Sequence, residues 1–252
     1  MRGERYLISG AGSGIGRSTA LQLAGEGAFV VLTGRDIIKL ESTAELLPVG
    51  TSYKLIALDI RDRQACISAA ESLQGITLNG IIANAGTGGE NHFGPDDRWQ
   101  EIIETNLTGT YQFVHAFLPL LRKRSAAFGH VVIISSVLAR LGVKNYTAYC
   151  ASKAGLLGLM RSWAVDLAPE KILVNAICPG WVNTKMSEDG MAGIAQGLGV
   201  SKDEFYSIAM RDVPLGKMTE PSEIAQLVCY LLHQNSMTGQ TIDINGGSVM
   251  NS

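Results

Sequence analysis

Short runs of aliphatic and β-branched residues recur along the whole chain. Seven of these runs are nearly continuous rather than alternating with polar residues: YLIS, FVVLT, KLIAL, GIIA, HVVII, ILVNAI and TIDI. Because an uninterrupted apolar strand must be covered on both faces, they predict a parallel sheet between two layers of helices. The amphipathic segments between them predict helices at residues 15–25, 36–47, 62–73, 97–124, 147–168 and 221–233.

This alternation of strand and helix predicts an α/β fold. Two βαβαβ units give a doubly wound, Rossmann-like parallel sheet of about seven strands with helices on both faces. Without a linker or a low-complexity tract, residues 1–252 are expected to form a single domain. Residues 184–214 contain helical patches but no strand and follow the carboxyl end of a strand, so we expect a lid over a ligand site there.

Composition and charge exclude several classes of function. The 21 basic and 23 acidic residues give a net charge of -2 with no basic block, so no nucleic-acid partner is expected. The first ten residues lack the apolar region of a signal peptide, and no apolar run is long enough for a membrane span. We therefore expect a cytoplasmic protein. Its four widely spaced cysteines predict neither a disulfide framework nor a metal site.

A glycine-rich turn, SGAGSGIG, lies between the first predicted strand and the first predicted helix. Gly10, Gly14 and Gly16 let the main chain turn tightly and approach a pyrophosphate, which the N–H groups and the dipole of the helix would bind. The spacing is G-x3-G-x-G rather than G-x-G-x-x-G. Its place between strand and helix favours a dinucleotide site over a turn that binds no ligand.

The residues at the end of the second predicted strand indicate which dinucleotide would bind. A carboxylate for the ribose 2′-hydroxyl is expected there, but the chain has Gly34 followed by Arg35. A guanidinium suits a 2′-phosphate, so NADP(H) is the preferred cofactor if Arg35 is more than a solvated turn residue. NAD(H) stays possible, because Asp36 would accept the ribose hydroxyls if it turned inward.

Candidate catalytic residues follow the fifth strand. In YCASK, Tyr149 and Lys153 are four residues apart and would share one face of a helix. Twelve residues separate Ser136 from Tyr149, enough for the chain to bring them together. We expect the ammonium to lower the pKa of Tyr149, which would exchange a proton with a substrate oxygen held by Ser136. The alternative is a Tyr–Lys pair used only for packing.

Taken together, these segments resemble the short-chain dehydrogenase/reductase family in its shorter single-domain form, over essentially the whole chain. The family motifs T-G-x3-G-x-G, N-N-A-G and Y-x3-K correspond to SGAGSGIG, ANAG and YCASK. Ser9 keeps the hydroxyl of the family threonine, whereas Ala83 removes an amide, which would slightly loosen the hydrogen bonding near Asn84. The resemblance implies hydride transfer between NAD(P)H and a small-molecule carbonyl or secondary alcohol.

The resemblance also implies individual site residues. Asn106 in ETNLTGTY matches the catalytic asparagine of the family, which would hold a water that relays protons from Lys153. The catalytic residues implied by the resemblance are then Asn106, Ser136, Tyr149 and Lys153. Asp59 would bind the adenine amino group, and the segment that follows the sixth strand would bind the nicotinamide. The expected cofactor contacts are Gly10, Ser13, Gly14, Ile15, Gly16, Arg35, Asp59, Ile60, Asn84, Ala85, Gly86, Tyr149, Lys153, Pro179, Gly180, Val182 and Thr184. No metal is expected.

Substrate, partners and alternatives stay open at this point. The resemblance extends to 3-oxoacyl-carrier-protein reductases and to sugar-alcohol or hydroxy-acid dehydrogenases, and no single residue chooses between them. Apolar residues of the lid either line a substrate pocket or pack within the lid: Met186, Met191, Phe205, Tyr206 and Met210. A homo-oligomer, expected to be a tetramer, is predicted because helices 97–124 and 147–168 carry small or apolar residues on more than one face. Examples are Ala116, Leu120, Leu156, Leu159 and Trp163. The alternatives are a non-catalytic dinucleotide sensor and an isomerase or lyase.

Overall fold

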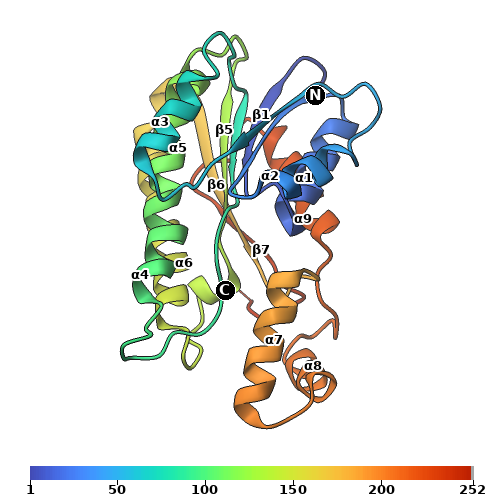
Figure 1. Ribbon diagram of the computed structural model, residues 1–252. Coiled ribbons are helices and arrows are strands. Elements are labelled where there is room, and N and C mark those ends of the chain that lie inside the picture. The colour runs from blue at the N-terminus through green and yellow to red at the C-terminus, as the bar shows by residue number, and fades with distance from the viewer. Residues whose placement is uncertain (251–252) are drawn as a thin grey trace.

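A parallel sheet forms the centre of the computed structural model, which describes residues 1–250 (Figure 1). Within these residues its strands are β1 (Arg5–Ser9), β2 (Phe29–Gly34), β3 (Tyr53–Ala57), β4 (Gly80–Ala83), β5 (Gly129–Ile134), β6 (Ile172–Pro179) and β7 (Thr241–Ile244). Their order is β3-β2-β1-β4-β5-β6-β7, and every neighbouring pair is parallel. All seven predicted strands and the doubly wound arrangement are confirmed.

Helices cover both faces of the sheet, as Figure 1 shows. The helices are α1 (Gly14–Gly25), α2 (Ile37–Ala44), α3 (Arg63–Glu71), α4 (Trp99–Ile103), α5 (Gly109–Arg122), α6 (Thr147–Asp166), α7 (Lys185–Leu198), α8 (Lys202–Arg211) and α9 (Pro221–Leu232). Helices α1, α2 and α9 lie on one face, and α3, α5 and α6 lie on the other. The long helix predicted at residues 97–124 is divided into α4, a π-helical turn at Glu104–Thr108 and α5.

The apolar strands bury alternate side chains in two separate cores. Leu7 and Ile81 pack with the helices α3, α5 and α6, whereas the next residues along the strands, Ile8 and Ile82, pack with α1, α2 and α9. All four side chains are fully buried. Both faces of the sheet are therefore covered by packed side chains. The carboxyl edge of the strands remains as the place where a ligand can bind.

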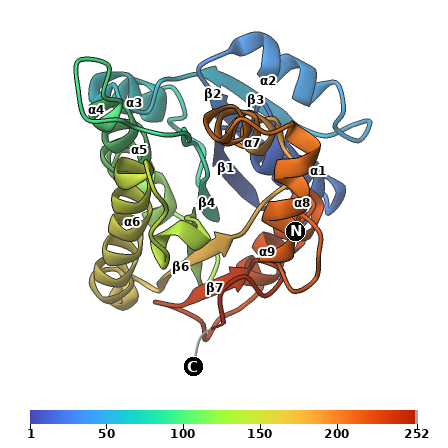
Figure 2. The ribbon, with the colours of Figure 1, turned by 90° about the horizontal axis from the view of Figure 1, so that it is seen from below.

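The chain between β6 and α9 projects beyond the carboxyl ends of the strands, where α7 and α8 stand apart from the two helical layers (Figures 1 and 2). A bridge between Val182 and Thr219 closes the base of this excursion. Its apolar residues form a small core of their own: Met191, Ala195, Phe205, Ala209, Met210 and Val213. Most of the apolar residues singled out in the lid therefore pack within it, and Tyr206 is exposed.

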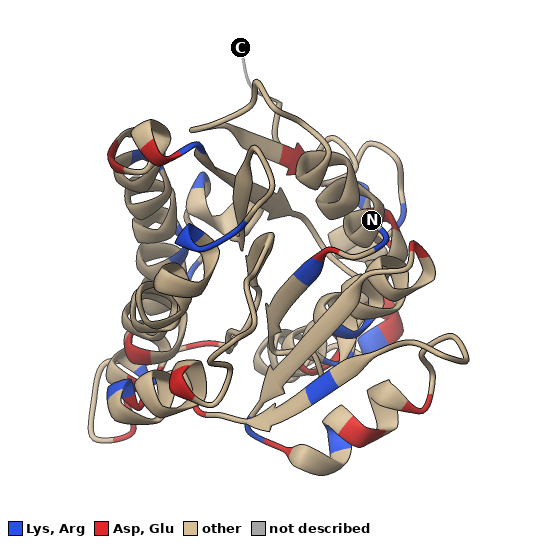
Figure 3. Ribbon diagram, turned by 90° about the horizontal axis from the view of Figure 1, so that it is seen from above, with Lys and Arg blue, Asp and Glu red and all other residues tan. Residues whose placement is uncertain are grey.

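Charged side chains of both signs are interspersed over the helices and loops in the view of Figure 3. No helix within residues 1–250 has the length and the apolar character needed to cross a membrane. The four cysteines are free thiols; Cys150 is half-buried and the other three are buried.

Candidate active site

A cavity of about 580 Å³ opens along the carboxyl edge of the sheet. It lies where the strand order reverses between β1 and β4, the position at which doubly wound sheets bind ligands. Its wall includes every cofactor and catalytic residue expected from the sequence except Gly16 and Asn106. Residues from segments far apart in the chain, from Gly10 to Pro221, are thus brought together around one space.

The glycine-rich turn needs its glycines for close approach. Gly10 has a φ of +67°, and a Cβ there would lie 2.9 Å from the Cα of Ala85. At Gly16 a Cβ would lie 2.2 Å from the carbonyl oxygen of Gly10, closer than any contact allows. Gly16 therefore lies outside the cavity wall and acts by letting α1 begin directly against the turn.

The amino end of α1 is open toward the cavity. Its N-cap residue, Ser13, makes no side-chain hydrogen bond to the helix, and the first turn contains no acidic residue. By contrast, α2 is capped by Asp36 and α7 by Thr184. Since the first N–H groups of a helix need acceptors, the uncapped end of α1 is suited to bind the phosphates of a dinucleotide.

Ser9 and Asn84 brace this turn against the end of β4. The Ser9 hydroxyl oxygen accepts the main-chain N–H groups of Asn84 and Ala85, both at 3.0 Å. The Asn84 amide donates to the carbonyl oxygens of Ser9 at 2.9 Å and Gly10 at 3.3 Å. None of these bonds involves the side chain of Ala83, and the loosening expected from its missing amide stays a prediction.

Arg35 and Asp36 differ in what they contact. Asp36 is used by its own helix: its Oδ1 accepts the N–H groups of Ile38 at 3.1 Å and Lys39 at 3.3 Å. Arg35 is exposed and lines the cavity, whereas Asp36 is absent from the cavity wall. The inward carboxylate that would bind ribose hydroxyls is therefore not formed by Asp36 in this structure.

Asp59 has a partner that the sequence motifs did not indicate. Arg61 donates to both of its carboxylate oxygens, with the closest pair of atoms 2.6 Å apart. These hydrogen bonds hold the pKa of Asp59 below its usual range. Asp59 lines the cavity as a carboxylate already paired with a guanidinium, and a contact to adenine stays a prediction.

The phenol of Tyr149 lies beside Ser136 and Lys153 in the cavity wall. Although its side chain is partly open to the cavity, burial raises the pKa of Tyr149 to about 12, and the Ser136 hydroxyl offsets only part of this effect. Lys153 Nζ lies 5.6 Å from the centre of the Tyr149 ring and donates to the carbonyl oxygen of Ile134 at 3.0 Å. The expected lowering of the Tyr149 pKa is therefore wrong, because loss of solvation outweighs the effect of neighbouring groups.

Lys153 is also buried, and burial shifts its pKa in the opposite direction to that of Tyr149. Burial of the ammonium lowers the pKa of Lys153 to about 8. Near neutral pH the cavity therefore contains a neutral phenol and an ammonium that is still charged. This combination can donate a proton to a substrate oxygen and attract electron-rich groups of a cofactor or substrate.

Asn106 lies in the π-helical turn and is fully buried. Its Oδ1 accepts the N–H of Thr87 at 2.8 Å, and its Nδ2 donates to the Thr87 carbonyl oxygen at 2.9 Å and the Ser152 hydroxyl at 3.1 Å. The side chain thus joins the loop after β4 to α6. A relay water at Asn106 stays a prediction and would have to bind elsewhere than at these occupied side-chain atoms.

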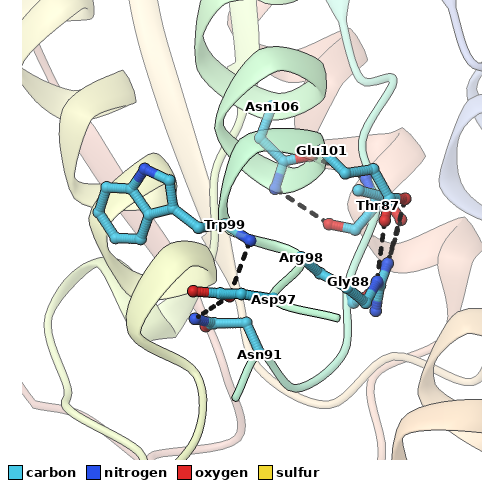
Figure 4. Close-up of polar contacts among 8 residues, drawn as sticks. All are labelled: Thr87, Gly88, Asn91, Asp97, Arg98, Trp99, Glu101 and Asn106. Carbon is cyan, nitrogen blue, oxygen red and sulfur yellow. Dashed lines mark hydrogen bonds and ion pairs between the residues drawn. The ribbon is translucent and has the colours of Figure 1, made fainter. Parts of the chain in front are cut away.

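Arg98 was not indicated by any sequence motif. It donates to the carbonyl oxygen of Gly88 at 3.1 Å and to the Thr87 hydroxyl at 3.4 Å, and it pairs with Glu101 at 2.8 Å (Figure 4). Arg98 therefore fastens the loop that forms one side of the cavity. Its only sequence signal is an arginine three residues before a glutamate on a helix, which is common on protein surfaces.

Similar proteins share the whole length of this fold. Residues 10–249 match the family described as enoyl-(acyl carrier protein) reductase. The 3-oxoacyl-(acyl-carrier-protein) reductase FabG of Haemophilus influenzae is 31% identical over 253 residues, which is 98% of each chain. Among solved structures, an actinorhodin polyketide ketoreductase with NADPH has a TM-score of 0.91 at 30% identity, over 97% of both chains. A carveol dehydrogenase from Mycobacterium avium in complex with NAD has a TM-score of 0.90 at 30% identity, over 98% of both chains.

The extent of these similarities agrees with the motifs and with the cavity at the strand ends. The glycines of the dinucleotide turn, strands β2 to β7 and the Tyr149–Lys153 pair all lie within the matched region. This chain belongs to the short-chain dehydrogenase/reductase family and is an NAD(P)-dependent oxidoreductase.

Proposed function

We propose that the protein reduces the carbonyl group of a 3-oxoacyl-type substrate in the cytoplasm, with NADPH as the preferred hydride donor and Tyr149 as the acid. The observation that carries this proposal is the meeting of Ser136, Tyr149 and Lys153 in one wall of a cavity that also contains the dinucleotide turn. A FabG protein and a polyketide ketoreductase among the similar proteins favour a 3-oxoacyl substrate over a polyol.

The cavity wall has the groups that this reaction needs. A reduced nicotinamide bound in the cavity would supply the hydride to the carbonyl carbon. Ser136 Oγ accepts the N–H of Leu138 at 3.1 Å, and its hydroxyl is hydrogen-bonded to the Tyr149 phenol, so it is placed to bind the substrate oxygen beside the acid. Because the pKa of Tyr149 is raised to about 12, the phenol is protonated at neutral pH and can protonate the developing alkoxide. The charged Lys153 beside it stabilises that negative charge.

Consumption of NADPH, followed by absorbance at 340 nm, tests the proposal. We expect turnover with a 3-oxoacyl thioester and weaker turnover with simple ketones or a polyol and NADP⁺. A trans-2-enoyl thioester belongs in the panel, because the matching family is described by enoyl reduction. Turnover of the enoyl thioester alone would contradict the proposal. Dinucleotide binding without turnover of any substrate would favour the sensor alternative.

Arg35→Ala is expected to abolish a preference for NADPH over NADH. A charge-assisted contact to the 2′-phosphate contributes about ten- to a hundredfold in affinity, and Arg35 is exposed at the cavity. The measurement is kcat/KM with each cofactor for wild type and variant. Asp36→Asn is the matched control: it removes a charge but keeps the oxygen that caps α2, so the ratio should not change. A wild type that prefers NADH would show that Arg35 does not bind the nucleotide.

We also propose that residues 184–214 form a lid that closes over the bound dinucleotide. Lys185, Met186 and Ser187 at the start of α7 line the cavity, and the small apolar core lets α7 and α8 move together. The four glycines of this segment are the hinge points that its sequence offers, but Gly190, Gly193 and Gly197 lie inside α7 and only Gly199 lies at its end. Movement is therefore expected at the ends of the segment rather than within α7.

Limited proteolysis is expected to cut this lid first in the free protein and more slowly after NADPH is added. The exposed turn at residues 48–52 lies at the far end of β3 and offers an internal control, because cutting there should not depend on the cofactor. Equal rates of lid cleavage with and without NADPH would identify a static packing element.

A homotetramer formed through α4, α5 and α6 is the proposed assembly. Leu120, Leu156 and Trp163, among the residues used to predict an oligomer, are buried in the core and give no support. Trp99, Tyr111 and Val165, however, are large apolar side chains that are 41%, 47% and 75% exposed on these helices.

Light scattering should return about four times the chain mass of 26.9 kDa. Val165→Asp is expected to lower this mass, whereas Ile38→Asp, a change at a 72% exposed residue on α2, is expected to leave it unchanged. A wild-type monomer at micromolar concentration would contradict the proposed assembly.

A further inference from the structure

The helix that carries Tyr149 lacks a cap of its own. Helix α6 begins at Thr147, so Tyr149 lies in its first turn, and the N-cap residue Tyr146 makes no side-chain hydrogen bond to the helix. The missing acceptor comes from a distant part of the chain: Oδ1 of Asn91 accepts the N–H of Ala148 at 2.9 Å. An N-cap bond stabilises the first turn of a helix and fixes where it begins.

Asn91 also holds the turn that leads into this helix. Its own main-chain N–H donates to the carbonyl oxygen of Asn145 at 2.7 Å. Asn145 has a φ of +63°, in the left-handed region, so this turn has a conformation that needs support from its surroundings. The two bonds from Asn91 hold the chain on either side of Tyr146 and connect the start of α6 to the loop between β4 and α4.

Asp97 fixes the direction of the Asn91 side chain. The Asn91 Nδ2 donates to Asp97 Oδ1 at 3.1 Å, and the same oxygen accepts the N–H of Trp99 at 3.0 Å at the start of α4 (Figure 4). Because the carboxylate accepts only from the amide nitrogen, the amide oxygen of Asn91 must point away from it and toward Ala148. Asn91 is 9% exposed, so water does not replace these partners freely.

The same loop holds the first turn of α6 from its other side. Ser152 donates to the carbonyl oxygen of Tyr149 at 2.8 Å and accepts from Asn106, which in turn binds Thr87. The loop also approaches the tyrosine ring, since a Cβ added at Gly88 would lie 3.7 Å from Tyr149 Cε2. The position of the phenol therefore depends on how this loop is fastened.

We propose that Asn91, oriented by Asp97, is a positioning residue that places the Tyr149 phenol for proton transfer. This inference rests on the proposed role of Tyr149 as the acid. Neither Asn91 nor Asp97 lines the cavity, so neither contacts the cofactor or the reacting atoms. Loss of the cap should therefore reduce kcat more than it reduces cofactor binding, since small displacements of a catalytic group lower the rate strongly.

Asn91→Ala is expected to lower kcat about tenfold while the Kd for NADPH, measured by fluorescence, stays within about twofold of wild type. Asn91→Asp keeps the acceptor for Ala148 but turns a second oxygen toward Asp97, so a similar loss is expected. Asp97→Ala removes the carboxylate that orients the Asn91 amide, so it should also lower kcat while the Kd for NADPH stays within about twofold of wild type. Asp96→Asn is the matched control, since it removes one charge from an exposed residue of the same loop.

An Asn91→Ala variant that retains more than half of the wild-type kcat would overturn the inference. If Asn91→Ala does not fold, Asn91→Asp, which keeps the shape of the side chain and the acceptor for Ala148, still decides, because a wild-type kcat in that variant would also overturn it. The parent proposal fails separately: an active Tyr149→Phe variant would remove the role of Tyr149. An inactive Tyr149→Phe variant with a fully active Asn91→Ala variant would remove only the role of Asn91.

Discussion

Tyr149→Phe is expected to lower kcat by at least about 10², the effect typical of losing a general acid, while the fold and the Kd for NADPH change little. The phenolic hydroxyl is the only group that the change removes. It lies beside Ser136 in the cavity wall, and its raised pKa of about 12 keeps the proton available for transfer at neutral pH. Phenylalanine fills the same space without that proton.

The measurement compares kcat and NADPH binding for Tyr149→Phe and for a matched control, Tyr146→Phe. Tyr146 is the nearest similar phenol, with its ring centre 6.3 Å from that of Tyr149 in an edge-on arrangement, and it is buried. Its hydroxyl is outside the cavity wall, so the control should lose less than about threefold. More than a tenth of the wild-type turnover in Tyr149→Phe would rule out the assigned role.

The parts of this molecule that could be predicted from the sequence are those with a local signal. Strands such as Gly80–Ala83 were found because both of their faces are buried, which leaves no polar residue to interrupt the apolar run. Gly10 and Gly16 were found because only glycine permits the close approach that the turn requires. Each of these requirements acts on a few consecutive residues, so it is visible in the order of the residues.

Other features depend on contacts between distant segments and left no such signal. The contact between Asn91 and Ala148 joins residues 57 positions apart, and neither has a type that marks it. The π-helical turn at Glu104–Thr108 inserts into an apolar pattern that continues on both sides of it. The pKa of Tyr149 was predicted in the wrong direction because its neighbour Lys153 is visible in the sequence, whereas the loss of solvation depends on packing from several elements.

Lys153→Met is expected to lower kcat by at least about 10² and, unlike Tyr149→Phe, also to weaken NADPH binding by about tenfold or more. The resemblance to the family assigns the ammonium a second contact, with the nicotinamide ribose. Lys144→Met offers a control, because Lys144 is an exposed lysine of the loop before α6. A Lys153→Met variant that binds NADPH like the wild type would restrict the role of Lys153 to proton transfer.

The same change should alter how stability depends on pH. Burial lowers the pKa of Lys153 to about 8, below the value of about 10.4 in an unfolded chain. Between these values Lys153 binds more protons in the unfolded state, so its contribution to the free energy of unfolding rises by on the order of 3 kcal/mol as the pH rises from 8 to 10.5. Below pH 8 both states are protonated, and the folded state carries the full cost of a buried charge.

Methionine does not titrate, so the Lys153→Met variant should lack this gain. The variant also leaves the carbonyl oxygen of Ile134 without its donor, which costs about 1–3 kcal/mol at every pH. The two effects separate in denaturant unfolding at pH 7.5 and 10, because only the titration changes with pH. We expect the wild type to gain stability relative to Lys153→Met between these two values, and Lys144→Met to follow the wild type. A difference between wild type and Lys153→Met that is the same at both pH values would show that the folded and unfolded states bind the same number of protons at Lys153, so that burial does not lower its pKa.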